Sequence, residues 1–302
     1  MRFYFSLLAL LVGLLIGTSC VDRTELLVPG GEYQDKPIRP DYPDNPDEPV
    51  VTPPVMGVVE FSKKLQTSDG TSWVPELSGL CLSRDGDFLW GCDDNGGLYE
   101  IHFDGSFSLH WDKSAEMEGL TMDYNTGIMY IGLEETAKSG YVVQPPYTSK
   151  IDLPFAVEGA ANMGNSGVEG IAWYKDDLLF GTQEGAMLFH YKLDGTLVSK
   201  KSLRSVCSTI SEVADLCYDA EKDWLWVIDS NSNKDNAQYD PYTLYLFNGD
   251  ATKLLAKYPL KGIADWNPEA ICVDKQNGCI WVGEDCDSSY PSRLHKVKFS
   301  GL

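Results

Sequence analysis

Residues 76–105 of this 302-residue chain have the sequence ELSGLCLSRDGDFLWGCDDNGGLYEIHFDG, which predicts three short β-strands in succession. The apolar runs 80–82, 88–90 and 98–103 are separated first by the polar turn 84–87 and then by the acidic loop 93–95. A turn at Asp104 and Gly105 ends the third run. One unit of this kind cannot bury both faces of its sheet, so we expect it to pack against others.

The same pattern returns four more times along the chain. The first strands of the copies begin at Leu80, Leu120, Ile171, Leu216 and Ile271, at spacings of 40, 51, 45 and 55 residues. The second strand of each copy closes with an aromatic residue, and only the second copy has a degraded third strand. Multi-stranded repeats of roughly 40 to 50 residues are typical of a β-propeller.

The last copy ends in its third strand at Phe299, so its sheet needs one more strand from elsewhere. Residues 57–61 precede the first copy, belong to none, and have a strand pattern. We expect them to be the outer strand of the last blade, because joining the two ends removes exposed sheet edges. The prediction is an all-β domain over residues 56–302, a five-bladed β-propeller, with six blades as the alternative. Within it, residues 203–213 are expected to form a long loop with at most one helical turn.

The N-terminal segment has the features of an export signal. Arg2 precedes an apolar run over residues 4–17 that is too short to span a bilayer comfortably, and small residues lead to Cys20. Gly17-Thr18-Ser19-Cys20 resembles a bacterial lipobox, with Gly17 where Leu is usual. Residues 1–19 are therefore expected to be a lipoprotein signal peptide and Cys20 the lipidated residue, with ordinary secretion as the alternative.

Residues 20–55 contain half of the 16 prolines, interleaved with Asp and Glu. Such a composition predicts an extended Pro/Asp-rich tether rather than a packed domain. The lipid would then be the only link to a membrane. We expect a monomer in the cell envelope, lipid-anchored to the outer membrane and either periplasmic or surface-exposed.

Acidic residues recur at the ends of the predicted strands. In a propeller, the starts of the first strands and the ends of the second strands share one rim of the central channel. The starts contribute Glu76, Glu118, Glu169, Glu212 with Asp215, and Glu269; the ends contribute Asp93 with Asp94, Glu134 with Glu135, Glu184, Asp229, and Glu284 with Asp285. We expect these acids to meet around one acidic rim.

Crowded carboxylates either take up protons or bind a cation, and a flexible ring of oxygen ligands suits Ca²⁺ better than Zn²⁺. The expected metal ligands are Glu118, Glu169 and Glu269, followed by Glu76, Asp94 and Asp229. The alternative for each acid is that it caps its own turn or accepts backbone N–H groups. The net charge of −21 excludes a nucleic-acid backbone as the partner, because phosphate binding requires clustered Lys and Arg.

The chain resembles the SdiA-regulated family of bacterial proteins, a branch similar to NHL-repeat propellers. The resemblance covers residues 56–302 and is carried by Glu76-Leu77-Ser78-Gly79-Leu80, Glu118-Gly119-Leu120, Glu169-Gly170-Ile171 and the ending over residues 98–105. It implies a five-bladed propeller with a bound calcium ion and a role in protein–protein contact. The glycine is missing from Val213-Ala214-Asp215 and Pro268-Glu269-Ala270, which leaves the ligand set open.

Three functions follow from this pattern. The favoured one is a membrane-anchored, calcium-binding propeller that acts as a binding or protein-interaction module for an unknown protein or small molecule. The second is a calcium-dependent hydrolase of phytase-like or lactonase-like type, in which the ion would polarise an ester or phosphoryl oxygen. Near the rim, however, only Lys138, Lys234 and Arg293 could bind phosphate, and no histidine is placed to serve a serine nucleophile. No catalytic residue is predicted.

The third function is glycan binding. Trp73 and Trp266 precede Glu76 and Glu269 in the same rim loops, where each either contacts a ligand or packs under its own loop.

The cysteines give less information about function. Apart from Cys20 there are seven, an odd number, of which Cys81, Cys217 and Cys272 share one core position and Cys92 and Cys286 are candidates for a bridge.

Overall fold

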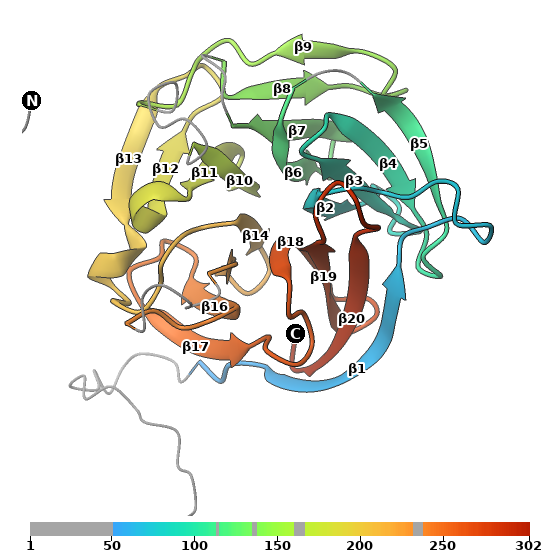
Figure 1. The fold of residues 1–302 in the computed structure, drawn as a ribbon. Coiled ribbons are helices and arrows are strands. Elements are labelled where there is room, and N and C mark those ends of the chain that lie inside the picture. Colours follow the sequence, from blue (N-terminus) through green and yellow to red (C-terminus); the bar gives the residue numbers. More distant parts are fainter. Residues whose placement is uncertain (1–50, 113–114, 135–137, 160–166, 232–237) are drawn as a thin grey trace, which may run out of the picture. The chain divides into compact units, whose positions relative to one another are not determined.

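A computed structural model of the chain describes residues 51–302 except 113–114, 135–137, 160–166 and 232–237 (Figure 1). The predicted signal peptide, Cys20 and nearly all of the tether lie outside the described residues. Over the described part, the chain folds into five four-stranded antiparallel sheets arranged around a central channel. The predicted five-bladed β-propeller is confirmed.

The first four blades each follow the chain without interruption. The first blade comprises β2 (Leu77–Leu82), β3 (Leu89–Asp93), β4 (Gly97–Ile101) and β5 (Phe107–Asp112). The second comprises β6 (Met117–Asp123), β7 (Ile128–Leu133), β8 (Gly140–Val143) and β9 (Lys150–Asp152). The third comprises β10 (Val168–Tyr174), β11 (Asp177–Thr182), β12 (Met187–Tyr191) and β13 (Leu197–Ser202). The fourth comprises β14 (Asp215–Asp219), β15 (Trp224–Asp229), β16 (Thr243–Asn248) and β17 (Leu254–Pro259).

The fifth blade joins the two ends of the domain. It consists of β18 (Asn267–Asp274), β19 (Cys279–Asp285), β20 (Arg293–Ser300) and, on its outer edge, β1 (Val55–Lys64). β1 pairs antiparallel with β20 from Val55 opposite Ser300 to Lys64 opposite Arg293. In Figure 1 the blue strand β1 accordingly runs beside the dark red strand β20. This confirms the predicted closure, in which the segment before the first repeat completes the last blade.

The first strands β2, β6, β10, β14 and β18 surround the channel and contact their neighbours around the ring. Their close approach explains the glycine after the repeated acid. A Cβ atom on Gly119 would lie 2.6 Å from the backbone nitrogen of Ile171, and one on Gly170 would lie 2.8 Å from Cα of Asp215. The neighbouring first strands therefore leave no room for a side chain at these positions.

The repeated aromatic of the second strands belongs to the core. Trp90, Tyr130, Phe180, Trp226 and Trp281 are all buried, with at most 6% of their surface exposed. Trp281 of the fifth blade stacks on Phe103 of the first, with ring centroids 5.3 Å apart. The core therefore fills the spaces between blades, which is why a single blade is not stable by itself.

Helical structure in the described residues is limited to single turns such as η2 (Glu184–Ala186) and η3 (Leu203–Ser205). η3 is the one helical turn in the segment 203–213, which is otherwise a loop as predicted. In the part of the chain that the structure describes, no helix is long and apolar enough to cross a membrane.

The seven cysteines in the described residues are all free thiols. Cys92 and Cys286, the candidates for a bridge, are therefore unpaired: Sγ of Cys92 lies 3.6 Å from the carbonyl oxygen of Met117 and Sγ of Cys286 lies 3.8 Å from that of Glu284. Cys81 and Cys272 are buried beside the channel and Cys217 is half-buried, as expected for their shared position on the first strands.

Candidate functional site

Eight carboxylates meet at one end of the central channel, and we refer to this group as the channel mouth. All five blades contribute, and each member interacts electrostatically with at least one other. The members are Glu76 and Asp94 of the first blade, Glu118 and Glu134 of the second, Glu169 of the third, Glu212 of the fourth, and Glu269 and Asp285 of the fifth. Five of the six expected metal ligands, all but Asp229, belong to this group.

A β-bulge places three of these acids. The pairing of first and second strands shifts register at Glu118, Glu169 and Glu269, between Met117 and Leu120, Val168 and Gly170, and Pro268 and Ala270. A bulge inserts an extra residue and changes the direction of its side chain. The three side chains therefore do not follow the regular alternation between the two faces of the sheet. They project from the start of the strand.

The other two blades supply their acid from two residues further upstream. Ser78 and Ala214 occupy the positions that correspond to Glu118, and the acids of these blades are Glu76 and Glu212. Glu76 accepts hydrogen bonds from the side chain of Asn95 and the backbone N–H of Ser288, whereas Glu212 accepts one of 2.7 Å from the hydroxyl of Ser230. Each blade therefore places one acid at the mouth from the start of its first strand, either through a bulge or from the loop just upstream.

Burial and mutual repulsion both act on the central acids. Burial raises the pKa of Glu118 well above its usual value, and the neighbouring charges of Glu169 and Asp94 raise it further. Burial likewise raises the pKa of Glu169, with Glu134 and Glu269 as the next causes, and that of Glu269, with Asp285 and Glu212 as the next. The side chains of Glu118 and Asp94 share a hydrogen bond, as do those of Glu169 and Glu134. Because two carboxylates cannot hydrogen-bond without a proton between them, the mouth holds protons when no cation is there.

Two oxygens of the mouth accept no hydrogen bond from an N–H group or a hydroxyl. Oε1 of Glu169 and Oδ1 of Asp94 are enclosed by protein, and the polar groups that share a hydrogen bond with these side chains are the carboxyls of Glu134 and Glu118. Enclosed carboxyl oxygens that lack N–H or hydroxyl donors are rare in folded proteins because the lost hydration costs free energy. Here they are oxygens of two different blades that converge on the same mouth.

The donor set of the mouth consists of carboxylate oxygens, which is the chemistry that Ca²⁺ prefers. In the side-chain positions of the structure, no group of three or more His, Cys, Asp or Glu among the described residues is arranged so that it could hold a metal ion. The residue types fit such an ion, and so do the two enclosed oxygens without N–H or hydroxyl donors. Binding would require the carboxylates to lose their shared protons and move together.

Three of the expected rim acids instead accept backbone N–H groups of the rim loops. Asp93 accepts the backbone N–H of Gly97 at 2.6 Å and the hydroxyl of Tyr99 at 2.7 Å. Asp229 accepts the backbone N–H groups of Ser211 at 2.6 Å and Asn231 at 3.0 Å, and Glu284 accepts that of Trp266 at 2.7 Å. Burial raises the pKa of Asp93 to about 6 and that of Asp229 to about 7. Asp93 therefore caps its own turn, Glu284 accepts an N–H group of a neighbouring loop, and Asp229 does both.

The remaining expected rim acids lie elsewhere. Asp215 is fully buried in the channel wall rather than at the mouth, and accepts backbone N–H groups of Leu80, Leu216 and Ile271. Glu184 lies exposed in η2, and Glu135 is outside the described residues. The expectation that these acids all meet at one rim is thus wrong for Asp215, whose side chain replaces the glycine of the repeat and faces backbone donors, while Glu212 represents its loop at the mouth.

The basic residues near the rim are engaged with acids where they are described. Lys138 forms an ion pair with Asp152, and Nε of Arg293 lies 3.8 Å from Oε2 of Glu284. Lys234 lies outside the described residues. A phosphate group would therefore have to compete with existing ion pairs for Lys138 and Arg293.

Exposed aromatic rings stand beside the mouth. Trp73 is 37% exposed and Trp266 is 54% exposed, so neither is fully buried under its own loop. The ring of Trp266 lies 6.1 Å from that of Tyr290, which is 55% exposed. Sequence patterns do not single out Tyr290. The only signal for it is its place in a polar loop between the second and third strands of the last repeat.

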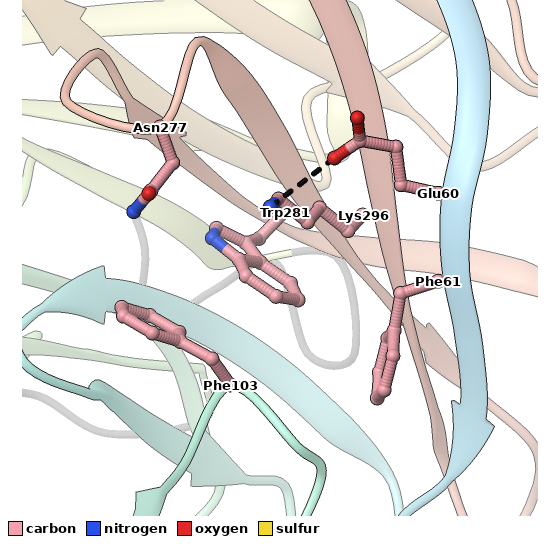
Figure 2. Close-up of a pocket in the computed structure, with 6 residues that line it drawn as sticks. All are labelled: Glu60, Phe61, Phe103, Asn277, Trp281 and Lys296. Carbon is pink, nitrogen blue, oxygen red and sulfur yellow. Dashed lines mark ion pairs between the residues drawn. The ribbon is translucent and has the colours of Figure 1, made fainter.

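A separate cavity of about 270 Å³ lies at the seam between the fifth and first blades (Figure 2). Its walls are Glu60, Phe61, Phe103, Asn277, Trp281 and Lys296. Asn277 and Phe103 belong to turns at the end of the blades opposite the mouth. Lys296 pairs with Glu60 at 3.2 Å, which the dashed line in Figure 2 marks, and Trp281 is only 1% exposed. The residues of this cavity contact one another and hold the fifth blade against the first. The candidate site is therefore the mouth, where Glu169 and Asp94 lie, and not this cavity.

Comparison with known proteins adds information on the fold. No protein-family model matches the chain, and no curated protein matches its sequence. Among solved structures, the glutaminyl cyclase of Myxococcus xanthus is similar with a TM-score of 0.57 and 13% identity, over 82% of this chain and 97% of that one. A luciferin-regenerating enzyme gives a TM-score of 0.49 and 10% identity over 83% and 98%, and a chain of a mitotic checkpoint complex gives 0.43 and 12% over 75% and 63%. At these identities only the fold is shared, and the domain is a β-propeller with a fold similar to that of glutaminyl cyclase.

Proposed function

We propose that the channel mouth binds one calcium ion and that the propeller acts as a binding module in the cell envelope, anchored by a lipid on Cys20. One observation carries the calcium site: eight carboxylates from five blades interact electrostatically around one mouth, and Glu169 and Asp94 each keep an enclosed oxygen there that accepts no N–H or hydroxyl donor. A divalent cation would satisfy these oxygens and replace the repulsion among the acids by attraction.

Glu118, Glu169 and Glu269 would hold the ion, with Glu76 and Asp94 as further ligands. Asp229 is left out of this set because its oxygens already accept the N–H groups of Ser211 and Asn231. The resemblance of the repeats to the SdiA-regulated family supports the same ion. A bound ion would fix the loops of all five blades at one end of the channel, and would thereby shape the surface that a partner meets.

The test is calcium titration of the purified domain by isothermal calorimetry and by Tb³⁺ luminescence. We expect about one ion per chain, and a stability gain of about 2.7 kcal/mol at a hundredfold excess over Kd. Glu169→Gln and Glu118→Gln keep the shape of the side chain and should weaken binding at least about tenfold. Glu184→Gln is the matched control, since Glu184 belongs to the same blade as Glu169 but is exposed in η2.

The proposal is abandoned if calcium changes neither heat, luminescence nor melting temperature in the wild type. It is also abandoned if Glu184→Gln weakens binding as much as Glu169→Gln, because the ion would then be held by the general negative charge of the surface. If Glu169→Gln loses affinity for calcium and Glu184→Gln does not, the ion is assigned to the mouth.

A second candidate is an enzyme that uses these acids for general acid–base chemistry. The observation that favours it is the pair of carboxyl–carboxyl hydrogen bonds, Glu118 with Asp94 and Glu169 with Glu134. Carboxyls that share a proton can act as a general acid and a general base, and a raised pKa favours the acid role. Bound calcium would add the ability to polarise an ester or phosphoryl oxygen, which is the hydrolase alternative.

This candidate is tested by turnover assays with lactones, phosphate esters and peptides with N-terminal glutamine, the last because of the fold shared with a glutaminyl cyclase. Turnover that depends on Glu118 and on calcium would replace the binding-module proposal by a hydrolase. Turnover of the glutaminyl peptide without calcium would indicate acid–base catalysis alone. Absence of turnover with calcium bound leaves the binding module.

A further inference from the structure

We propose that Trp73, Trp266 and Tyr290 form a docking surface for a basic segment of a partner protein, one that carries lysine or arginine side chains. We call these three residues the aromatic rim. The inference rests on the binding-module function proposed above and names the chemistry of the partner, but it does not require the calcium ion.

The aromatic rim is unusual in its exposure. Trp73, Trp266 and Tyr290 expose 37%, 54% and 55% of their surface. Among the described residues, Tyr124 is the other aromatic residue with a comparable exposure, at 46%, and it follows β6 at the opposite end of the channel. Exposed aromatic rings that gather at one place mark binding surfaces, because each leaves a large apolar area in contact with water.

The three rings belong to loops that lead into or lie within the fifth blade, or that connect it to the first. The rings of Trp266 and Tyr290 meet at 6.1 Å with an interplanar angle of 64°. Trp73 precedes Val74, whose carbonyl oxygen accepts the backbone N–H of Ser292 at 2.9 Å, and Ser292 follows Tyr290 by two residues. The loops that carry Trp73 and Tyr290 are thus tied together by the backbone, so the surface is formed before any partner binds.

The charge around the rim is negative. Asp265 and Asp287 are exposed in the loops of Trp266 and Tyr290, and the loop of Tyr290 begins directly after Asp285 of the channel mouth. Glu76, three residues after Trp73, accepts the backbone N–H of Ser288. The basic residues of these loops are Lys64, Lys261 and Arg293, and Arg293 already faces Glu284. Acids therefore outnumber cations on the surface that carries the aromatic rim.

Aromatic faces beside carboxylates suit a cation with an apolar stem. The ring face attracts the ammonium or guanidinium group, the methylene stem covers the ring, and the carboxylate neutralises the charge. Nucleic acids and anionic lipid surfaces are disfavoured as partners by the net charge of −21. A neutral sugar could stack on the rings and donate hydroxyl hydrogen bonds to the acids, but it would not neutralise their excess negative charge. Charge complementarity therefore selects a basic protein segment.

The experiment uses fluorescence anisotropy with labelled peptides of equal length, one rich in lysine and arginine, one neutral and one rich in glutamate, and a neutral oligosaccharide as competitor. We expect binding of the basic peptide alone, weakened as the salt concentration rises from about 50 mM to about 500 mM. The double variant Trp266→Ala and Tyr290→Ala should lose at least about tenfold in affinity. Asp287→Asn should lose less and show a weaker dependence on salt.

Leu109→Ala is the matched control, because Leu109 is 52% exposed but lies on the outer strand of the first blade. Calcium or Tb³⁺ binding by the double variant reports that the domain is folded, and circular dichroism reports the same if no ion binds. Loss of the basic peptide with the ion retained supports the docking surface. The proposal is overturned if the basic peptide fails to bind, if the double variant binds it as the wild type does, or if the oligosaccharide displaces it. If the protein binds no calcium but still binds the basic peptide through Trp266 and Tyr290, the result counts against the ion site only.

Discussion

Oδ2 of Asp215 accepts a 2.9 Å hydrogen bond from the backbone N–H of Ile271, which joins the fourth blade to the fifth inside the channel wall. Oδ1 of the same carboxyl accepts the backbone N–H of Leu216 at 2.7 Å, and the N–H of Leu80 in the first blade is a further donor. Asp215 occupies the position held by Gly119 and Gly170 in the second and third blades. The departure from the repeat therefore supplies an acceptor for three backbone groups of three blades.

Asp215→Ala should lower the free energy of unfolding by about 2–4 kcal/mol, since it leaves buried N–H groups without an acceptor. Asp215→Asn keeps an acceptor oxygen and should cost less than half as much. Urea denaturation of the two variants measures the difference, with the exposed Asp85→Ala expected within about 0.5 kcal/mol of the wild type. Equal losses in Asp215→Ala and Asp215→Asn would show that the hydrogen bonds are not what Asp215 contributes.

The channel glycines are expected to tolerate no side chain. A Cβ on Gly119 would approach the nitrogen of Ile171 to 2.6 Å and the carbonyl oxygen of Glu169 to 2.9 Å, and both are backbone atoms that cannot rotate away. Gly119→Ala should therefore lower stability by about 3 kcal/mol or prevent folding. Gly86→Ala, in a turn where the nearest atom is the flexible end of Gln276 at 3.4 Å, serves as a comparison that is strained only by its positive φ. A smaller loss in Gly119→Ala than in Gly86→Ala would contradict the close packing of first strands.

The closing strand contributes stability through its inward residues. Phe61 packs edge-on against Trp281 with ring centroids 6.0 Å apart, whereas Val58 on the same strand is 71% exposed. Phe61→Ala should lower the free energy of unfolding by about 2–4 kcal/mol, and Val58→Ala should change it by about 0.5 kcal/mol or less. Thermal unfolding of both variants distinguishes them. Equal melting temperatures would mean that β1 does not hold the ring closed.

The architecture could be predicted from the sequence because it repeats. Alternating apolar runs, turns such as Asp104-Gly105 and a recurring aromatic residue are local signals, and five copies reinforce one another. The closing strand follows from a count of strands, because the last copy lacks one. The close packing at Gly119 has no such local signal, since it depends on the distance between strands 52 residues apart, Gly119 and Ile171.

The mouth was predictable only in part. Glu118, Glu169 and Glu269 are the first three expected ligands, and they lie at the mouth because a bulge turns each of them there. Asp93 and Asp94 show the limit: they are neighbours in sequence, yet Asp93 caps its loop and Asp94 faces the mouth. Which of two adjacent acids turns inward depends on the register at the strand end, and sequence spacing does not contain that information.

The proposed lipid anchor has its own test. Cys20→Ser removes the thiol that would carry the lipid, so the variant should move from the membrane fraction to the soluble fraction. Cell fractionation with immunodetection measures this, and Cys207→Ser is the control because Cys207 is a buried free thiol of the propeller. A wild-type protein that is already soluble would show that residues 1–19 are an ordinary signal peptide.

The stability of the calcium-free domain should fall as the pH rises. Burial raises the pKa of Glu118, Glu169 and Glu269 above their values in the unfolded chain, and that of Asp229 to about 7. A carboxyl with a higher pKa in the folded state binds its proton more tightly there, so its contribution is full below the unfolded pKa and is lost as the pH rises through the folded pKa. We expect the melting temperature to decrease by about 5 °C or more between about pH 4 and about pH 7.

Calcium should oppose the loss of stability at higher pH if the mouth is its site, because the ion binds the deprotonated carboxylates. The gain in melting temperature on adding calcium should therefore grow with pH over the same range, and Glu169→Gln should reduce both the pH dependence without calcium and the gain with it. Differential scanning calorimetry at fixed ionic strength measures both, with Glu184→Gln as the control whose profile should match the wild type. A calcium-free melting temperature that rises from about pH 4 to about pH 7 would show that the mouth acids are not held protonated in the folded protein.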